Sequence, residues 1–119
     1  MKRILIVEDD PSVRAIFELV LGSRRYLVDA VSTATDAGLL LDLHPYDLVV
    51  ADWNLPDGSG VQVADRATAA GVKALIVSGF RISARNDNAS RHEVLTKPIR
   101  PAELLTLIES RIGAADPDS

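Results

Sequence analysis

The sequence predicts an α/β domain in which five parallel strands form one sheet with helices on both of its faces. Short apolar runs alternate with longer segments of helical periodicity along the chain, which is typical of repeated strand–helix units. Three of the runs are continuously apolar, as expected for strands that are buried on both faces. The five strands are expected at residues 4–7, 26–31, 46–51, 73–77 and 94–95.

The strength of the apolar runs also predicts the strand order. The run at 26–31 is interrupted by Asp29 and the run at 94–95 is short, so these two strands belong at the edges of the sheet. The strands richest in apolar residues then occupy the middle of the sheet, which gives a doubly wound sheet with the flavodoxin-like order 2-1-3-4-5 and right-handed crossovers. Residues 1–113 are expected to form this one domain, followed by a short C-terminal tail at residues 114–119.

Capping residues mark the expected helix boundaries. Asp10 and Pro11 suit the N-cap and the first position of a helix, and Ser32 or Thr33 can cap the next one. Gly71 is expected to end the third helix. Helices are therefore expected from residue 11 to residues 22–25, from 33 to 43, from 60 to 70 and from 101 to 112. The first helix is expected to turn its apolar stripe toward the core, namely Val13, Ile16, Phe17, Val20 and Leu21.

Composition excludes several classes of protein. The chain has 119 residues, of which 47% are hydrophobic and 25% are charged, and these values are ordinary for one globular domain. Its net charge of -4 disfavours nonspecific binding to nucleic acid. There is no cysteine, which excludes disulfides, thiolate catalysis and cysteine-bound metals. No apolar stretch approaches the ~20 residues of a membrane span. We therefore expect a cytoplasmic protein with neither a membrane nor a direct nucleic-acid partner.

Four of the apolar runs end in residues that can take part in chemistry. These strand ends are Glu8 with Asp9, then Asp52, Ser78 and Lys97. Because parallel strands end at the same edge of a sheet, where open α/β sheets bind ligands, we expect these side chains to form one cluster. The adjacent carboxylates of Glu8 and Asp9 repel each other unless a cation lies between them. Mg²⁺ fits this environment, because it prefers oxygen ligands and commonly binds carboxylates together with phosphate.

The remaining strand ends favour phosphoryl chemistry. Asp52 follows a buried strand and can act as a nucleophile that forms an aspartyl-phosphate. The backbone carbonyl of Asn54 can add a ligand for a hard cation. The hydroxyl of Ser78, a backbone amide made accessible by Gly79 and the ammonium of Lys97 can all pair with phosphoryl oxygens. Each residue taken alone also fits a structural role in a turn or at a strand end, and only the combination favours a site.

Four motifs together resemble the receiver domain of two-component response regulators, of the kind found in chemotaxis, over essentially the whole chain. They lie at residues 4–10, 47–56 with Gly60, 76–79 and 97–98. The resemblance implies that Asp52 accepts a phosphoryl group from a histidine kinase, a histidine phosphotransfer protein or a small phosphodonor. It also implies a protein that catalyses its own phosphorylation and slow dephosphorylation, and not an enzyme that acts on a separate substrate.

The resemblance further assigns roles around the acceptor. The implied Mg²⁺ ligands are Asp9, Asp52, the carbonyl of Asn54 and, largely through water, Glu8. The implied contacts to the phosphoryl group are Lys97, Ser78 and the backbone amides of Trp53 and Gly79.

The segment between the fourth strand and Lys97 departs from the family pattern. Receivers typically place an aromatic residue three positions before the lysine, where this chain has Val94. The segment between Ser78 and Lys97 is a few residues shorter than usual and polar, and residues 81–91 show little apolar periodicity. We therefore expect phosphorylation to act through ordering of the segment after the fourth strand, with output through the region from that strand to the last helix. Hydrogen exchange of residues 80–95, with and without a phosphoryl mimic, tests this expectation.

Several alternatives are compatible with the sequence. Because few residues follow the last helix, a stand-alone monomer or weak homodimer with an unknown downstream protein target is expected, and a receiver excised from a hybrid kinase is the alternative. A degenerate receiver would have the fold without being phosphorylated. A haloacid-dehalogenase-like phosphohydrolase would need a second aspartate where Asn54 stands. An electron carrier of the flavodoxin type would need a hydroxyl- and glycine-rich loop where residues 8–10 are acidic.

Overall fold

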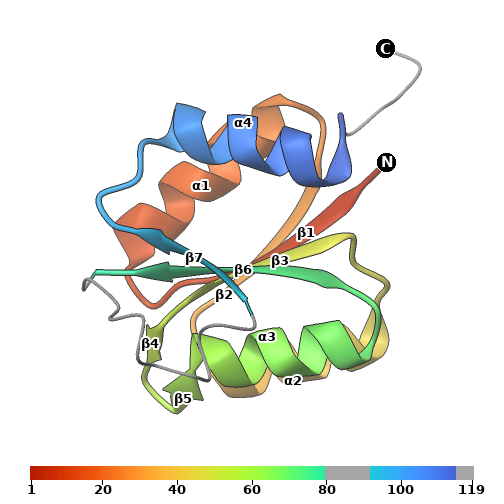
Figure 1. Ribbon diagram of the computed structural model, residues 1–119, viewed down its shortest axis with the longest axis vertical. Coiled ribbons are helices and arrows are strands. Elements are labelled where there is room, and N and C mark those ends of the chain that lie inside the picture. Colours follow the sequence, from red (N-terminus) through yellow and green to blue (C-terminus); the bar gives the residue numbers. More distant parts are fainter. Residues whose placement is uncertain (80–91, 115–119) are drawn as a thin grey trace.

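The computed structural model, which describes residues 1–79 and 92–114, contains the predicted five-stranded parallel sheet (Figure 1). Its strand order is β2-β1-β3-β6-β7, which confirms the flavodoxin-like order because β6 and β7 are the fourth and fifth strands of the sheet in sequence. The sheet consists of β1 (Arg3–Val7), β2 (Leu27–Val31), β3 (Leu48–Asp52), β6 (Lys73–Ser78) and β7 (Glu93–Thr96). The helices are α1 (Pro11–Ser23), α2 (Ala34–Leu43), α3 (Gly60–Ala69) and α4 (Pro101–Ile112).

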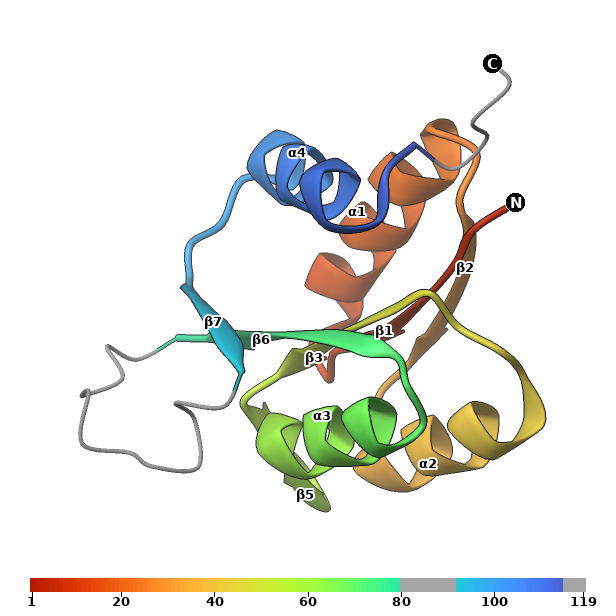
Figure 2. The ribbon, with the colours of Figure 1, turned by 45° about the vertical axis from the view of Figure 1, so that its right-hand side comes forward.

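Helices cover both faces of the sheet, with α1 and α4 on one side and α2 and α3 on the other (Figures 1 and 2). The alternation of side chains along β1 shows how one strand serves both cores. Ile4 and Ile6 belong to the core beneath α1 and α4, whereas Leu5 and Val7 belong to the core beneath α2 and α3. All four side chains are buried, so the strand that leads to Glu8 is fixed from both faces.

Helix α1 begins as predicted, but one residue of its apolar stripe is exposed. Asp10 caps the helix, since its Oδ1 accepts hydrogen bonds from the backbone N–H groups of Ser12 and Val13 at 2.8 and 3.3 Å. Phe17 is buried in the core, whereas Ile16 is 48% exposed, so the prediction that Ile16 faces the core is wrong. Ile16 instead lines an apolar groove between α1 and the loop after β7.

The segment between β3 and α3 differs from the turn-rich loop that the sequence predicts. Residues 54–59 form a short antiparallel hairpin of β4 (Asn54–Leu55) and β5 (Gly58–Ser59). Two residues per strand are too few to show a period in the sequence. Ser59 then starts α3 with a capping box, in which Ser59 Oγ accepts from the backbone N–H of Gln62 and Gln62 Oε1 accepts from that of Ser59.

The other boundaries agree with the expected caps. Of the two alternatives for α2, Thr33 is the N-cap, because its hydroxyl accepts the backbone N–H of Asp36 at 3.1 Å. Gly71 follows α3 with a φ of 80°, a left-handed conformation that glycine adopts without steric cost.

Within residues 1–79 and 92–114, no helix has the length and apolar character needed to cross a membrane. Residues 80–91, which include the segment of little apolar periodicity, and the predicted tail from residue 115 lie outside the described part.

Replacing Gly60 with alanine tests how tightly the hairpin closes on β3. A Cβ at Gly60 would lie 2.4 Å from the backbone oxygen of Asp52, and its three nearest atoms are all backbone atoms at the end of β3, which have little room to move. We expect Gly60→Ala to lower the free energy of unfolding by about 1–3 kcal/mol, as measured by urea denaturation. Gly22→Ala is the control, because a Cβ in that helical position has no atom of the described residues within 4 Å and helix propensity favours alanine. An equal loss in both variants would contradict this interpretation.

Candidate functional site

The predicted strand ends meet at one edge of the sheet. In the parallel register Val7 pairs with Ala51, Asp52 with Val77, and Ser78 with Thr96. Glu8 follows β1, Asp52 is the last residue of β3, Ser78 ends β6, and Lys97 follows β7. The sheet therefore brings together four side chains that are distant in the sequence.

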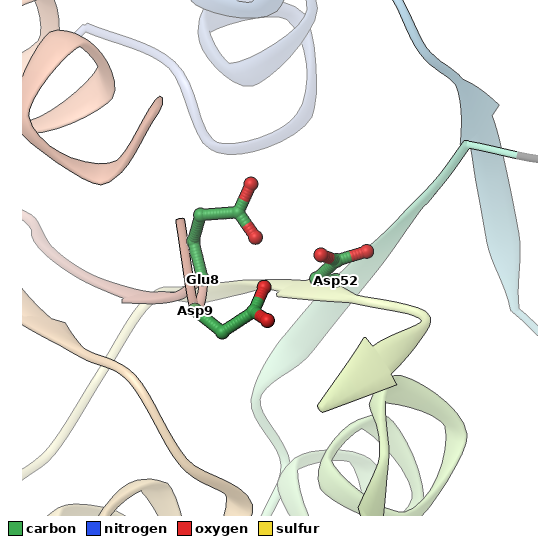
Figure 3. A group of neighbouring side chains, drawn as sticks. All are labelled: Glu8, Asp9 and Asp52. Carbon is green, nitrogen blue, oxygen red and sulfur yellow. The ribbon is translucent and has the colours of Figure 1, made fainter. Parts of the chain in front are cut away.

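Three acidic residues form the centre of this cluster (Figure 3). Oxygen atoms from the carboxylates of Glu8, Asp9 and Asp52 all lie within 4.8 Å of one another. Figure 3 shows that the three groups face a common space beside the ends of β1 and β3. Such a separation strongly disfavours full ionisation of all three groups unless positive charge lies close by.

Lys97 supplies part of that positive charge. Its Nζ donates to Glu8 Oε1 at 2.8 Å and to Asp52 Oδ2 at 3.3 Å. The backbone N–H of Lys97 donates to the carbonyl oxygen of Ser78 at 2.7 Å, which fixes the start of the loop after β7 against the end of β6. One ammonium therefore contacts two of the three carboxylates.

The two partners of this contact have shifted pKa values. Glu8 is only 3% exposed, and burial, together with the nearby carboxylate of Asp52, raises the pKa of Glu8 from 4.5 to about 7. Lys97 opposes this rise but does not cancel it. For Lys97 itself, burial lowers the pKa, while the contacts with Glu8 and Asp52 raise it by more, so the net shift is upward. The lysine therefore stays charged while Glu8 is close to its point of titration at neutral pH.

The geometry fits a divalent cation. Glu8 Oε2 is buried and has no hydrogen-bond partner among the described residues, so its lone pairs are available to a ligand. When Glu8 is ionised, three carboxylates and one ammonium leave two negative charges, which is the charge that Mg²⁺ balances. The carboxylates of Glu8, Asp9 and Asp52 are the groups that can hold this ion. Asn54, the fourth predicted ligand, begins β4 two residues after Asp52 and is exposed.

The structure also places the residues expected to contact a phosphoryl group. Ser78 is buried at the end of β6. Among residues 1–79 and 92–114, no atom lies within 4 Å of a Cβ built on Gly79, so these residues leave space beside it. The backbone N–H of Trp53, which was expected to contact the phosphoryl group, here donates to the carbonyl of Val77 at 2.8 Å, and its contact with a phosphoryl group stays a prediction. Pairing of β3 with β6 extends through Asp52, and the next amide in the chain completes the same ladder.

Two positioning contacts escaped prediction from the sequence. Arg14 in α1 donates from Nη1 to the backbone oxygen of Glu8 at 2.9 Å and so holds the acidic loop. Asp57, at the tip of the hairpin, accepts hydrogen bonds from the start of α2. An arginine on a helix and an aspartate before a glycine are common on protein surfaces, so neither had a distinguishing signal in the sequence.

Comparison with known proteins identifies the family. The family model described as the response regulator receiver domain matches residues 4–109. This chain belongs to that family. The response regulator receiver protein CpdR of Brucella abortus is 31% identical over 120 residues, covering 97% of this chain and 100% of CpdR. The response regulator PilR of Pseudomonas aeruginosa is 28% identical, and the cell cycle response regulator CtrA of Brucella abortus is 29% identical. The receiver chain spans 28% of PilR and 49% of CtrA.

Solved receiver structures share the fold. A CheY-like receiver from Methanospirillum hungatei superposes with a TM-score of 0.86 at 25% identity, covering 94% of each chain. The response regulator TrrA of Thermotoga maritima, solved in complex with Mg²⁺-BeF, gives 0.82 at 25% identity, covering 92% of this chain and 98% of TrrA. The receiver of a sensor histidine kinase from Pseudomonas aeruginosa, solved with a magnesium ion in its active site cleft, gives 0.81 at 25% identity, covering 95% and 98%.

The raised pKa of Glu8 predicts that the metal-free receiver loses stability as the pH rises. Because the folded pKa of about 7 exceeds the ordinary value of 4.5, the stabilising effect of the protonated group is complete below 4.5 and disappears above 7. Between pH 5.5 and 8, in EDTA, we expect a loss on the order of 1–2 kcal/mol in urea unfolding. Glu8→Gln, which stays neutral, should remove this part of the pH dependence, and an unchanged slope in the variant would refute the assignment.

Proposed function

We propose that this receiver takes up a phosphoryl group on Asp52 from the phosphohistidine of a histidine kinase or a histidine phosphotransfer protein. The observation that supports this best is the position of Asp52 Oδ2, 3.3 Å from the ammonium of Lys97 and within the acidic cluster at the sheet edge. Phosphorylation would then alter contacts with a downstream protein, and the domain would turn over no separate substrate. A cytoplasmic location is part of the same proposal.

The side chains can carry out the transfer without further acid–base groups. A carboxylate oxygen of Asp52 attacks the phosphorus atom, an O–P bond forms as the N–P bond breaks, and the electron pair stays on the imidazole nitrogen. Lys97 remains protonated and offsets charge on the phosphoryl oxygens, because its contacts with Glu8 and Asp52 raise its pKa overall despite burial. When Mg²⁺ is bound, it supplies further charge neutralisation between the carboxylates and these oxygens.

Ser78 and Gly79 are proposed to contact the transferred group. Ser78 lies next to the site at the end of β6, and the space beside Gly79 can admit a phosphoryl oxygen. Movement of Ser78 would affect Lys97, because the carbonyl of Ser78 accepts the backbone N–H of Lys97. The expected ordering response falls mainly on residues 80–91, which are outside the described part, and it remains a prediction.

The donor protein also needs a docking surface beside the site. An apolar groove with a volume of about 380 Å³ lies between α1 and the loop after β7. It is lined by Val13, Ile16, Phe17, Lys97, Pro98, Ile99 and Pro101. Lys97 lines this groove and also contacts Glu8 and Asp52, so a protein bound in the groove lies next to the acidic cluster. We propose that the phosphodonor protein places an apolar helix surface here, with the exposed Ile16 as a contact.

Intact mass spectrometry tests phosphorylation directly. After incubation with acetyl phosphate and Mg²⁺, the wild-type receiver should gain one phosphoryl group and Asp52→Asn should gain none. Asp47→Asn is the control, since Asp47 lies at the opposite end of β3, is exposed, and accepts the backbone N–H of Arg3. EDTA should abolish the gain in the wild type, because the carboxylate charges are then not neutralised.

The same experiment separates the alternatives. A wild type that gains no phosphoryl group from acetyl phosphate, a histidine kinase or a phosphotransfer protein would be a degenerate receiver. Continuous release of phosphate from phosphate esters, at many equivalents per protein, would instead indicate a phosphohydrolase.

Substitution of Ile16 tests the docking surface. We expect Ile16→Gln to slow transfer from a phosphorylated histidine phosphotransfer protein by roughly tenfold, because an apolar contact of about 1.4 kcal/mol is lost. Phosphorylation by acetyl phosphate should be unchanged, since that donor needs no docking. Leu19→Gln is the control, as Leu19 is 73% exposed on the same helix but does not line the groove. Equal slowing in both variants would argue against this surface.

A further inference from the structure

The hairpin between β3 and α3 is too small to maintain its own shape. It pairs Asn54 with Ser59 and Leu55 with Gly58, and these two pairs are its whole ladder. Isolated two-stranded hairpins are marginal in water even when they are longer. The conformation of this hairpin, and with it the position of Asn54, must therefore come from contacts with the rest of the domain.

Asp57, at the tip of the hairpin, makes such contacts with α2. Its Oδ1 accepts the backbone N–H of Ala34 at 2.7 Å. Its Oδ2 accepts the backbone N–H of Thr35 at 2.9 Å and the hydroxyl of Thr35 at 2.5 Å. These hydrogen bonds, to the hydroxyl first and then to the two amides, lower the pKa of Asp57. The side chain is therefore ionised at neutral pH and keeps all three acceptor contacts.

The carboxylate of Asp57, which is distant from α2 in the sequence, accepts backbone N–H groups at the start of this helix. The first N–H groups of a helix have no partner within the helix and carry partial positive charge. Here Asp57 accepts the first two of them, and Thr33 accepts the third, that of Asp36. The N-terminus of α2 thus has two independent caps, one from its own chain neighbour and one from the hairpin.

A second attachment holds the base of the hairpin. The backbone N–H of Gly60 donates to the carbonyl oxygen of Trp53 at 2.9 Å, and Gly60 lies directly against the backbone of Asp52. Asn54 is located between this attachment and the one at Asp57. Its backbone is consequently fixed from both sides relative to the acidic cluster.

We propose that Asp57 is a positioning residue for the cation site, because its contact with the N-terminus of α2 fixes the hairpin that carries Asn54. This inference rests on the proposed function. Loss of the contact frees the hairpin tip, so a cation then has to order the Asn54 loop when it binds. The affinity of the site for the cation therefore falls, although the carboxylates of Glu8, Asp9 and Asp52 are unchanged.

Titration calorimetry with Mg²⁺ compares two variants that remove different caps of the same helix. Asp57→Ala removes the hairpin contact, and Thr33→Ala removes the local cap. Both weaken the start of α2, but only Asp57→Ala releases the hairpin. We expect Asp57→Ala to raise the Kd for Mg²⁺ by roughly tenfold, a typical size for the loss of a residue that orients a ligand. Thr33→Ala should leave the Kd unchanged, and Asp57→Asn, which keeps one carbonyl acceptor, should give a smaller rise.

Phosphorylation kinetics provide the second readout. With acetyl phosphate, Asp57→Ala should be slow at limiting Mg²⁺ and recover the wild-type rate at saturating Mg²⁺. Equal Kd values for Asp57→Ala and wild type, or equal rises in Asp57→Ala and Thr33→Ala, would overturn the positioning role while leaving the proposed function intact. A wild type that binds no Mg²⁺ and takes up no phosphoryl group would instead overturn the proposed function and this inference with it. Should Asp57→Ala fail to fold, Asp57→Asn gives the same comparison.

Discussion

The crowding of three carboxylates at one edge of a parallel sheet is the constraint on which the rest of this receiver depends. At an effective dielectric constant of about 20, two unit charges separated by 4–5 Å repel by about 3–4 kcal/mol. The oxygens of Glu8, Asp9 and Asp52 lie within 4.8 Å of one another, so this repulsion is comparable to a large part of the stability of a small domain, about 5–15 kcal/mol. The site persists because buried strands hold the acids together and Lys97 offsets part of their charge.

The acids are held by rigid elements and by backbone contacts to their loops. Strands β1 and β3 are buried on both faces, so the residues at their ends cannot separate without disturbing two cores. Arg14 holds the backbone of Glu8, and the N–H of Trp53 continues the sheet beyond Asp52. Protonation of Glu8 or binding of a cation would change the repulsion between carboxylates whose backbone these contacts hold.

The sequence predicted the fold best where a local pattern of residues is typical of one kind of element. Continuous apolar runs in β1, β3 and β6 can only be buried strands here, and their parallel pairing brings Glu8, Asp52 and Ser78 together. It was less informative where the packing of a single residue decides. The hydrogen bond of the Trp53 amide depends on how far β3 pairs with β6, and the exposure of Ile16 reflects the groove that remains beside α1. Neither quantity is encoded in a local pattern of residue types.

The contacts of Lys97 connect the proposed chemistry to its output. The ammonium is shared between Glu8 and Asp52, so a phosphoryl group on Asp52, which carries about −1.5 to −2 charges, competes with Glu8 for it. If Lys97 shifts toward the phosphoryl oxygens, as the proposed function implies, the hydrogen bond between its backbone N–H and the Ser78 carbonyl would couple that shift to the end of β6. Because the loop after Lys97 also lines the apolar groove beside α1, the same shift would alter the surface proposed to dock the donor. A phosphorylated receiver would thereby present a different groove from the unphosphorylated one, which favours release of the donor after transfer.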